Sequence, residues 1–271
     1  MPIMNLLVAF NGSEASIAAL RYAASMARAR DAHVTAMMAH STHDVFDTRS
    51  RWIPSEARKL LSEAKAGILH EIEARYEALR DELDLGDALS FQSHPGKVDA
   101  TLSEAARYYD MIIVGRQLDE DDEHVALHPD RIALLSGRPV IVVPDGYDIE
   151  ARHSHAALAW DGGRSAARAL SDSLRLLEVQ GRVSVLTVGK KSGFPIEDLM
   201  THLARHDVEA LHDNFPDSHP VAETILAFCE RNDPSLLVMG AYEHSKFRED
   251  FLGGVTAKVL QDIRIPVLLS H

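Results

Sequence analysis

A glycine-rich pattern near the end of the chain is suited to holding phosphate. Gly240 closes an apolar run, and Gly253-Gly254 opens the next helical segment, with Thr256 in its first turn. Unpaired backbone N–H groups at a helix start attract anions, and glycine lets a phosphate approach the backbone closely. Thr256 adds a hydroxyl donor. Because the spacing fits neither the P-loop nor the dinucleotide-binding fingerprint, the pattern predicts a phosphate site of another type.

Two other segments are expected to meet this pattern in space. Asp161-Gly162-Gly163 follows an apolar run and precedes a helical one, and a second apolar run ends at Val188. In open α/β sheets, ligands bind outside the carboxyl ends of the strands, where the strand order reverses. We therefore expect the ligand site between these turns, in the C-terminal half of the chain.

The elements that must position these residues occur twice. Each half begins with an apolar run, a small-residue turn and an alanine-rich helical stretch, and closes with two more apolar runs. The matching segments are 6–13 with 156–163, 110–115 with 235–240, and 138–143 with 265–269. Continuous apolar runs are typical of strands covered on both faces, as in a parallel sheet.

The alternation of strands and helices predicts two tandem doubly wound α/β domains, each a five-stranded parallel sheet flanked by helices. We expect the domains to span residues 1–146 and 154–271, joined by a linker at about residues 145–153, where Pro144 and Gly146 mark a boundary. The first domain carries a polar insertion over residues 41–82, with a helix predicted at 55–83; the second shortens this region to 190–206.

These motifs resemble the universal stress protein family in its tandem form, over nearly the whole chain. The family's nucleotide loop has a glycine, two residues, a glycine, nine residues, a glycine and a small residue. Gly240, Gly253 and Gly254 fill the first, third and small positions, while Glu243 stands where the second glycine belongs. The resemblance implies an adenine nucleotide alpha hydrolase-like fold.

The resemblance also implies a site in the second domain for ATP, with Mg²⁺, or for AMP. Its residues would be Ala159, Asp161 and Val188 at the adenine and ribose, Met239, Gly240 and Tyr242 at the ribose and first phosphate, and Gly253, Gly254, Val255 and Thr256 at the polyphosphate. The Glu243 carboxylate would cost about 0.5 kcal/mol per like-charge pair at ~8 Å in water. Lys246 and Arg248 can offset it, and a protein without bound nucleotide fits the sequence equally well.

The first domain departs further from the family's loop. Leu118 and His128 stand at the second and third glycine positions, and Pro129, which lacks an N–H, follows. Residues 119–123 are all acidic, and Asn11 replaces the acidic residue expected after the first strand. This domain is therefore predicted to have a degenerate nucleotide loop.

Two functions remain open at this level. One is a stress-response protein that binds adenine nucleotide for regulation; the other acts without nucleotide, through contacts with protein partners that the sequence does not identify. ATP hydrolysis lacks a recognisable base or magnesium ligand set, so a catalytic role is not expected. The resemblance further implies that segments 140–143 and 267–269 join the domains as an internal pseudo-dimer, and a homodimer of whole chains is left open.

The remaining histidines and the cysteine have ordinary structural interpretations. His202 and His206 are four residues apart on a predicted helix, a spacing that zinc can use with a third ligand. Solvent-facing pairs of this kind are common, so no metal site is expected. Cys229 lies in an apolar helical stretch and is predicted to be buried.

Composition narrows the class of protein. The net charge of −13 disfavours binding to nucleic acid or to an anionic membrane surface. A single cysteine excludes a disulfide framework. No apolar stretch approaches the roughly 18 residues that span a bilayer, and the first apolar run meets Asn11-Gly12 too early for a signal peptide. We expect a cytoplasmic protein.

Overall fold

A computed structural model describes residues 3–41, 55–116, 124–147, 155–179, 181–189, 193–241 and 254–271. Strands and helices alternate along each half, as predicted. The N-terminal half contains β1 (Asn5–Ala9), α1 (Glu14–Arg30), β2 (His33–His40), α3 (Ser55–Leu83), β3 (Leu89–Pro95), α4 (Val98–Ala106), β4 (Met111–Gly115), α5 (Pro129–Leu135) and β5 (Val140–Val143). The C-terminal half contains β6 (His155–Ala159), α6 (Arg164–Leu177), β7 (Arg182–Val188), α7 (Ile196–Ala204), β8 (Ala210–Phe215), α8 (Val221–Asn232), β9 (Leu236–Gly240), α9 (Val255–Asp262) and β10 (Val267–Ser270).

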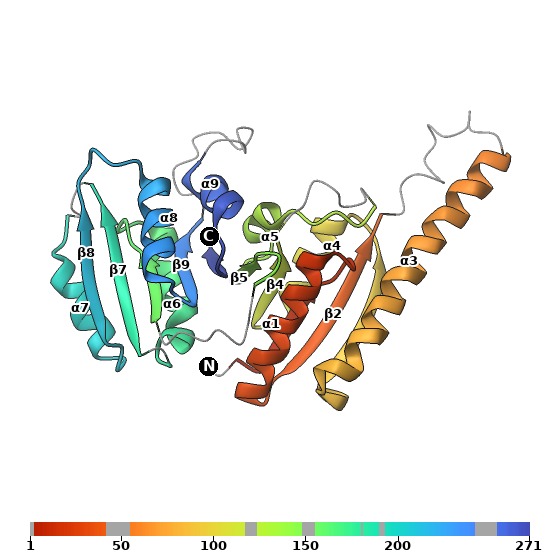
Figure 1. The fold of residues 1–271 in the computed structure, drawn as a ribbon, viewed down its shortest axis with the longest axis horizontal. Helices are drawn as coiled ribbons and strands as arrows, with labels where there is room; N and C mark the ends of the chain where they lie inside the picture. Colours follow the sequence, from red (N-terminus) through yellow and green to blue (C-terminus); the bar gives the residue numbers. More distant parts are fainter. Residues whose placement is uncertain are drawn as a thin grey trace.

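The two halves share one ten-stranded sheet (Figure 1), with strand order β3-β2-β1-β4-β5-β10-β9-β6-β7-β8. Within each half the five strands are parallel. The halves meet where β5 pairs antiparallel with β10, in the register Val142 to Val267 and Val140 to Leu269. This confirms that the last strands of the two halves pair, which saturates the edges that both strands would otherwise expose.

Helices cover both faces of the sheet. One core lies under α1, α3, α6 and α7 and includes Leu20, Ile72, Leu170 and Leu203. The other lies under α4, α5, α8 and α9. Strand residues alternate between the two cores, as Leu7 and Val8 do on β1. This two-sided burial accounts for the continuous apolar runs of the strands.

The long helix α3 has the bounds predicted from the sequence and covers the outer strands of the N-terminal half (Figure 1). Ile72, Tyr76, Leu79 and Leu83 are buried on one stripe at helical spacing. The Tyr76 ring packs tilted on Phe91 of β3, with 4.7 Å between ring centroids. The helix is thereby held across the sheet toward the carboxyl ends of β1 and β2. The short α7 stands at the corresponding place in the C-terminal half.

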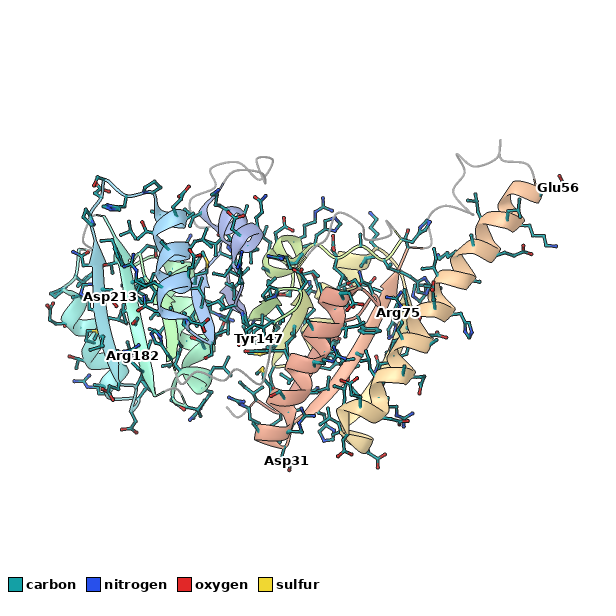
Figure 2. The ribbon with its side chains drawn as sticks, viewed as in Figure 1. Asp31, Glu56, Arg75, Tyr147, Arg182 and Asp213 are labelled. Atoms are coloured by element: carbon teal, nitrogen blue, oxygen red, sulfur yellow. The ribbon has the colours of Figure 1, made fainter. Side chains whose placement is uncertain are left out.

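Tyr147 lies in the middle of the molecule, between the two halves (Figure 2). Its ring packs edge-on against Tyr22 of α1, with 6.1 Å between centroids. Its hydroxyl donates to the carbonyl of Ser235, just before β9, at 3.4 Å. Burial raises the pKa of Tyr22 well above its usual value. The segment after β5 thus contacts both halves.

No helix among the described residues is long and apolar enough to cross a membrane.

Candidate functional site

The strand order of the C-terminal half reverses between β9 and β6, and four of the sequence-predicted residues meet there. Ala159 at the end of β6 pairs in register with Met239 of β9, so the two strands end side by side. Asp161 follows β6, and Gly240 is the last residue of β9. In doubly wound sheets this is where ligands bind. The prediction that these segments converge agrees with the strand pairing.

Asp161 shapes the turn that begins α6. Gly162 has a φ of +79°, a conformation that favours glycine. The Oδ1 atom of Asp161 accepts the backbone N–H of Gly163 at 2.8 Å. Gly163 is the N-cap of α6 and provides no side-chain cap. An acidic side chain therefore stands beside a helix N-terminus at the switch point.

Gly240 has a packing role in addition to any contact with ligand. A Cβ atom on Gly240 would lie 2.5 Å from the backbone N of Ala166, in the first turn of α6. Gly115, at the end of β4, shows the same relationship: its Cβ would lie 2.4 Å from the carbonyl carbon of Ala15 in α1. Both halves need glycine at this position because a helix crosses the strand end closely. This glycine alone does not identify a nucleotide site.

The N-terminus of α9 provides the exposed backbone of the candidate site. Gly254 is its N-cap, is exposed and makes no side-chain cap, and a Cβ there would meet no atom of the described residues within 4 Å. Val255 is exposed, whereas Thr256 is buried at 5% relative exposure. The predicted hydroxyl donor therefore has little accessible surface, and the exposed backbone starts at Gly254. Tyr242 and Gly253 lie outside the described residues, as do Glu243, Lys246 and Arg248.

Val188 stands one strand further along the same edge. It ends β7, which pairs with β6, and it is half-buried. Gly189 follows with a φ of +83° and donates its N–H to the carbonyl of Phe215 at 3.0 Å. The backbone N–H of Trp160 donates to the carbonyl of Leu186 at 2.8 Å, which extends the β6–β7 pairing into the turn. Val188 is thereby held near Ala159.

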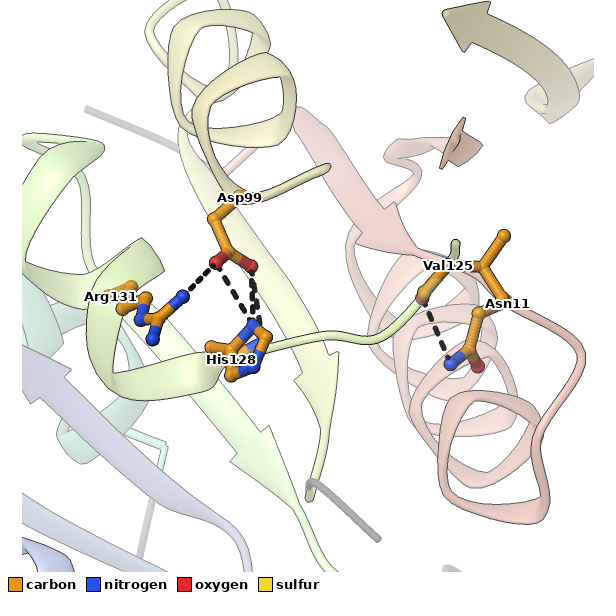
Figure 3. Close-up of polar contacts among 5 residues, drawn as sticks. All are labelled: Asn11, Asp99, Val125, His128 and Arg131. Atoms are coloured by element: carbon orange, nitrogen blue, oxygen red, sulfur yellow. Dashed lines mark hydrogen bonds and ion pairs between the residues drawn. The ribbon is translucent and has the colours of Figure 1, made fainter. Parts of the chain in front are cut away.

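In the N-terminal half, side chains of the protein fill the corresponding turn. Asn11 is buried, and its Nδ2 donates to the carbonyl of Val125 at 3.3 Å (Figure 3). Its Oδ1 accepts the N–H of Ser13 at 3.1 Å and the hydroxyl of Ser13 at 2.7 Å. Ser13 in turn caps α1 by accepting the N–H of Ser16 at 3.2 Å. The amide of Asn11 holds the 124–128 segment against the turn, a contact that a carboxylate could not donate.

Helix α3 covers the same turn from the other side. Arg75 donates from Nη1 to the carbonyl of Gly12 at 2.7 Å, and a Cβ on Gly12 would lie 3.2 Å from Cγ1 of Ile72. Lys65 donates from Nζ to the carbonyl of Ser41, after β2. Burial, followed by the charge of Lys65, lowers the pKa of His40 beside it. The sequence predicted this helix but not its position over the N-terminal switch point.

A carboxylate from another helix of the protein lies at the N-terminus of α5, a contact that was not predicted from the sequence. Asp99, the second residue of α4, accepts the backbone N–H of His128 through Oδ1 at 3.2 Å, and His128 is the N-cap of α5 (Figure 3). The His128 Nδ1 lies 3.0 Å from Asp99 Oδ2, and Nη1 of Arg131 lies 3.5 Å from the same oxygen. The sequence did contain one signal for this contact, namely the acidic residue Asp99 in the first turn of the helix that precedes β4 and the loop leading to α5.

The C-terminal half lacks each of these groups at the corresponding places. The second residue of α8 is Ala222, where α4 has Asp99. The third residue of α9 is Ala257, where α5 has Arg131, and the N-cap is Gly254, where α5 has His128. The two helix starts therefore differ in charge and in side-chain volume.

The histidine pair and the cysteine noted in the sequence make contacts typical of structural residues. The rings of His202 and His206 pack edge to face with 4.8 Å between centroids, and Nδ1 of His206 lies 3.9 Å from Oε1 of Glu178. Within the described residues no group of three or more His, Cys, Asp or Glu side chains could hold a metal ion. Cys229 is buried in α8, as predicted, and burial raises the pKa of its thiol to about 12.

Comparison with known proteins places the chain in a family. The model of the universal stress protein family matches residues 2–144 and 216–271, and the chain belongs to this family. The second matched segment includes Met239, Gly240 and Gly254, whereas Ala159, Asp161 and Val188 lie outside both segments. Universal stress protein Slr1230 of Synechocystis is 28% identical over 170 residues, which cover 59% of this chain. The match spans 57% of that relative's length.

Solved structures share the fold over almost the entire chain. A universal stress protein from Archaeoglobus fulgidus superposes with a TM-score of 0.71 at 17% identity, covering 98% of this chain and 95% of that one. A protein of unknown function from Pseudomonas aeruginosa PAO1 gives a TM-score of 0.58 at 15% identity, covering 99% and 92%. These similarities show that the chain shares the fold of these proteins over nearly its whole length, a fold of the adenine nucleotide alpha hydrolase-like type.

Proposed function

We propose that this universal stress protein binds an adenine nucleotide, ATP or AMP, in its C-terminal half, for regulation rather than catalysis. The observation that carries the proposal is the N-terminus of α9, where Gly254 is exposed, makes no side-chain cap and has no atom of the described residues within 4 Å of its Cβ position. A helix start of this kind presents unpaired N–H groups to an anion. It follows β9, which ends beside β6 at the strand-order reversal.

The contrast between the halves supports the same location. At α5 the carboxylate of Asp99 already occupies the N–H of His128. At α9 the corresponding residue, Ala222, brings no acid to the helix start. A phosphate approaching α5 would be repelled by Asp99 and hindered by His128, whereas one approaching α9 meets glycine. We therefore assign one nucleotide site per chain, in the C-terminal half.

The described residues suit the parts of a nucleotide. Ala159 and Val188 would lie along the base, with Asp161 at the ribose; Met239 and Gly240 would follow, and Gly254, Val255 and Thr256 would receive the phosphates through backbone N–H groups. The sequence adds Tyr242 and Gly253 to this set. Bound ATP would bring its own Mg²⁺, and the N-terminus of α9 would stabilise part of the remaining negative charge of the phosphates. Because the carboxylate in this set, Asp161, is placed at the ribose and not at the phosphates, the bound nucleotide is proposed as a signal.

The proposal is tested by what the purified protein contains and binds. Denatured protein should release adenine nucleotide on ion-exchange chromatography, and stripped protein should give heat with ATP or AMP in calorimetry. Gly254→Asp should weaken the affinity for ATP at least tenfold through charge repulsion. Gly254→Ala, whose Cβ meets no described atom within 4 Å, should fold normally and bind ATP more tightly than the aspartate variant. Protein that neither releases nucleotide nor gives heat with either ligand would refute the proposal.

An alternative is a universal stress protein that acts through protein contacts alone. It is favoured by the N-terminal half, where Asn11 and Arg75 fill the turn after β1 and Asp99 occupies the start of α5 with groups of the chain itself. Since β5 and β10 already pair within the chain, a whole-chain homodimer would require another surface. The alternative would gain support from absence of nucleotide together with a retained stress phenotype in the Gly254→Asp strain. For either function we propose a cytoplasmic location, consistent with a lone cysteine and no disulfide framework.

A further inference from the structure

Arg116 connects the N-terminal half to the far end of α9. It follows Gly115 directly, and its backbone N–H donates to the carbonyl of Val143 at 2.8 Å. Its guanidinium crosses to the C-terminal half, where Nη1 donates to the carbonyls of Gln261 at 3.2 Å and Ile263 at 3.1 Å. The second terminal nitrogen of the guanidinium, Nη2, pairs with the carboxylate of Asp145.

These contacts act where α9 has little support of its own. The helix has only eight residues, and its last turn contains no basic side chain. Its C-cap, Ile263, is extended with a ψ of 145° rather than left-handed, so the common glycine-type cap is missing. A cation at a helix C-terminus interacts favourably with the dipole and with the last carbonyls. Arg116 supplies that cation from the other half of the chain.

The base of Arg116 is rigidly placed. Gly115 lies so close to the Ala15–Ser16 backbone that even a Cβ would clash, and β4 pairs with both β1 and β5. Asp145 fixes the guanidinium from the segment after β5. Because α9 is about 12 Å long at 1.5 Å per residue, holding its C-terminus also limits where its N-terminus can lie.

The contact that Arg116 makes with the last helix of the other half is not made by the residue at the equivalent position of the C-terminal half. The residue that follows Gly240 in the C-terminal half, at the place of Arg116, is Ala241, which is fully buried. Its N–H donates to the carbonyl of Ser270 at 2.9 Å, as that of Arg116 does to Val143. A methyl side chain cannot reach across to α5. The N-terminal half therefore supports a helix of the C-terminal half through Arg116, and Ala241 makes no matching contact in return.

We propose that Arg116 is a positioning residue through which the N-terminal half sets the orientation of α9, and thereby the affinity of Gly254 and the following N–H groups for phosphate. The affinity part of this inference rests on the proposed function. Coupling is reciprocal, so a nucleotide at the N-terminus of α9 should strengthen the contacts of Arg116 at its C-terminus. The N-terminal half thus has a role in the site although it contributes no residue that touches the ligand.

The test compares Arg116→Ala with Arg116→Lys in the full chain, and Arg80→Ala serves as control because this exposed arginine pairs with Glu77 on α3. Hydrogen exchange is followed at the α9 amides, and ATP affinity is measured by calorimetry. We expect exchange in α9 to accelerate at least fivefold in the alanine variant, with β1 and β2 unchanged, and ATP affinity to fall about fivefold or more. Lysine should restore part of both, and Arg80→Ala should change neither.

The outcomes separate this inference from the proposed function. Wild-type exchange in α9 of Arg116→Ala would overturn the positioning role, whether or not ATP binds. Faster exchange with unchanged ATP affinity would overturn the link to the ligand while leaving the nucleotide site standing. If the wild-type protein gives no heat with ATP, the proposed function fails, and the exchange rates alone then decide whether Arg116 positions α9.

Discussion

The carboxylate of Asp99 accepts the backbone N–H of His128, with 3.2 Å between Oδ1 and N, so the N-terminal half places its own negative charge at the start of α5. Arg131 lies 3.5 Å from the second oxygen of the same carboxylate and partly balances it. The C-terminal half has the same backbone elements with Ala222 and Ala257 at the corresponding positions. Side-chain charge, rather than the course of the backbone, distinguishes the two helix starts.

Replacing Asp99 should destabilise the N-terminal half. Asp99→Ala leaves the N–H of His128 without its acceptor and removes a charge-assisted contact, so we expect a loss of about 1–3 kcal/mol in the free energy of unfolding. Urea denaturation followed by circular dichroism measures it. Glu104→Ala, at an exposed position on the same helix, is the control and should stay within about 0.5 kcal/mol. Equal effects of the two substitutions would contradict the assigned role of Asp99.

Transferring that acid to the C-terminal half should close its site. Ala222→Asp puts a carboxylate near the N-terminus of α9, where we expect ATP affinity to fall at least tenfold by repulsion and by competition for N–H groups. Ala222→Asn has nearly the same volume and polarity without the charge. Since Ala222 is buried, the charged aspartate should lower stability more than the neutral asparagine. The calorimetric affinities are therefore compared under conditions in which circular dichroism shows both variants folded, and their difference reports the effect of the charge. Equal affinities for the two variants would rule out this explanation.

The two strand-end glycines should be equally intolerant of a side chain. Gly115→Ala and Gly240→Ala each force a Cβ to within about 2.5 Å of helix backbone, and we expect each to cost about 1–3 kcal/mol or more. Gly254→Ala should cost at most about 0.5 kcal/mol, because its φ of −101° suits any residue and no described atom lies within 4 Å of the added Cβ. Thermal unfolding of the three variants provides the comparison. A large loss in Gly254→Ala would show that the helix start is not open.

The residues after the first strand of each half should not be interchangeable. In Asn11→Asp a carboxylate oxygen replaces the Nδ2 that donates to Val125, so an unpaired charge faces a carbonyl and we expect a loss of about 1–3 kcal/mol. Asp161→Asn keeps the Oδ1 acceptor for the N–H of Gly163 and should be nearly neutral for stability. Denaturant unfolding at neutral pH distinguishes the two. If Asn11→Asp left the free energy of unfolding unchanged, this would argue against the Val125 contact.

Cys229 should react only when the protein unfolds. Burial raises the pKa of its thiol to about 12, so the nucleophilic thiolate is scarce in the native protein at pH 8. Because the unfolded pKa is about 8.5, the contribution of this thiol to stability is complete below that pH and is lost as the pH rises toward 12. Ellman's reagent should label the native protein slowly and the urea-unfolded protein at once. Cys229→Ala should lose less stability than wild type between pH 9 and 11.

Much of the fold could be predicted from local patterns in the sequence. The apolar runs 110–115 and 235–240 indicated buried parallel strands, and the periodicity of residues 55–83 matched helix α3 to its ends. Repetition of the same order indicated two similar halves, and the resemblance to a family indicated that β5 and β10 join them, whereas the antiparallel register came from the structure. These predictions succeeded because periodicity and turn residues report the local environment of a segment directly.

The candidate site was determined by the sequence only in part. The glycine positions and the substitutions His128 and Pro129 indicated that the two helix starts differ. The surroundings of the turn after β1 and of helices α5 and α9 were decided by contacts between residues far apart along the chain: Asp99 with His128, Arg75 with Gly12, and Arg116 with Gln261, 29, 63 and 145 residues apart respectively. No local pattern encodes such a pairing, because it depends on how the strands are ordered and on which face each helix covers. The residue types were therefore set by the sequence, and their chemical partners only by the tertiary structure.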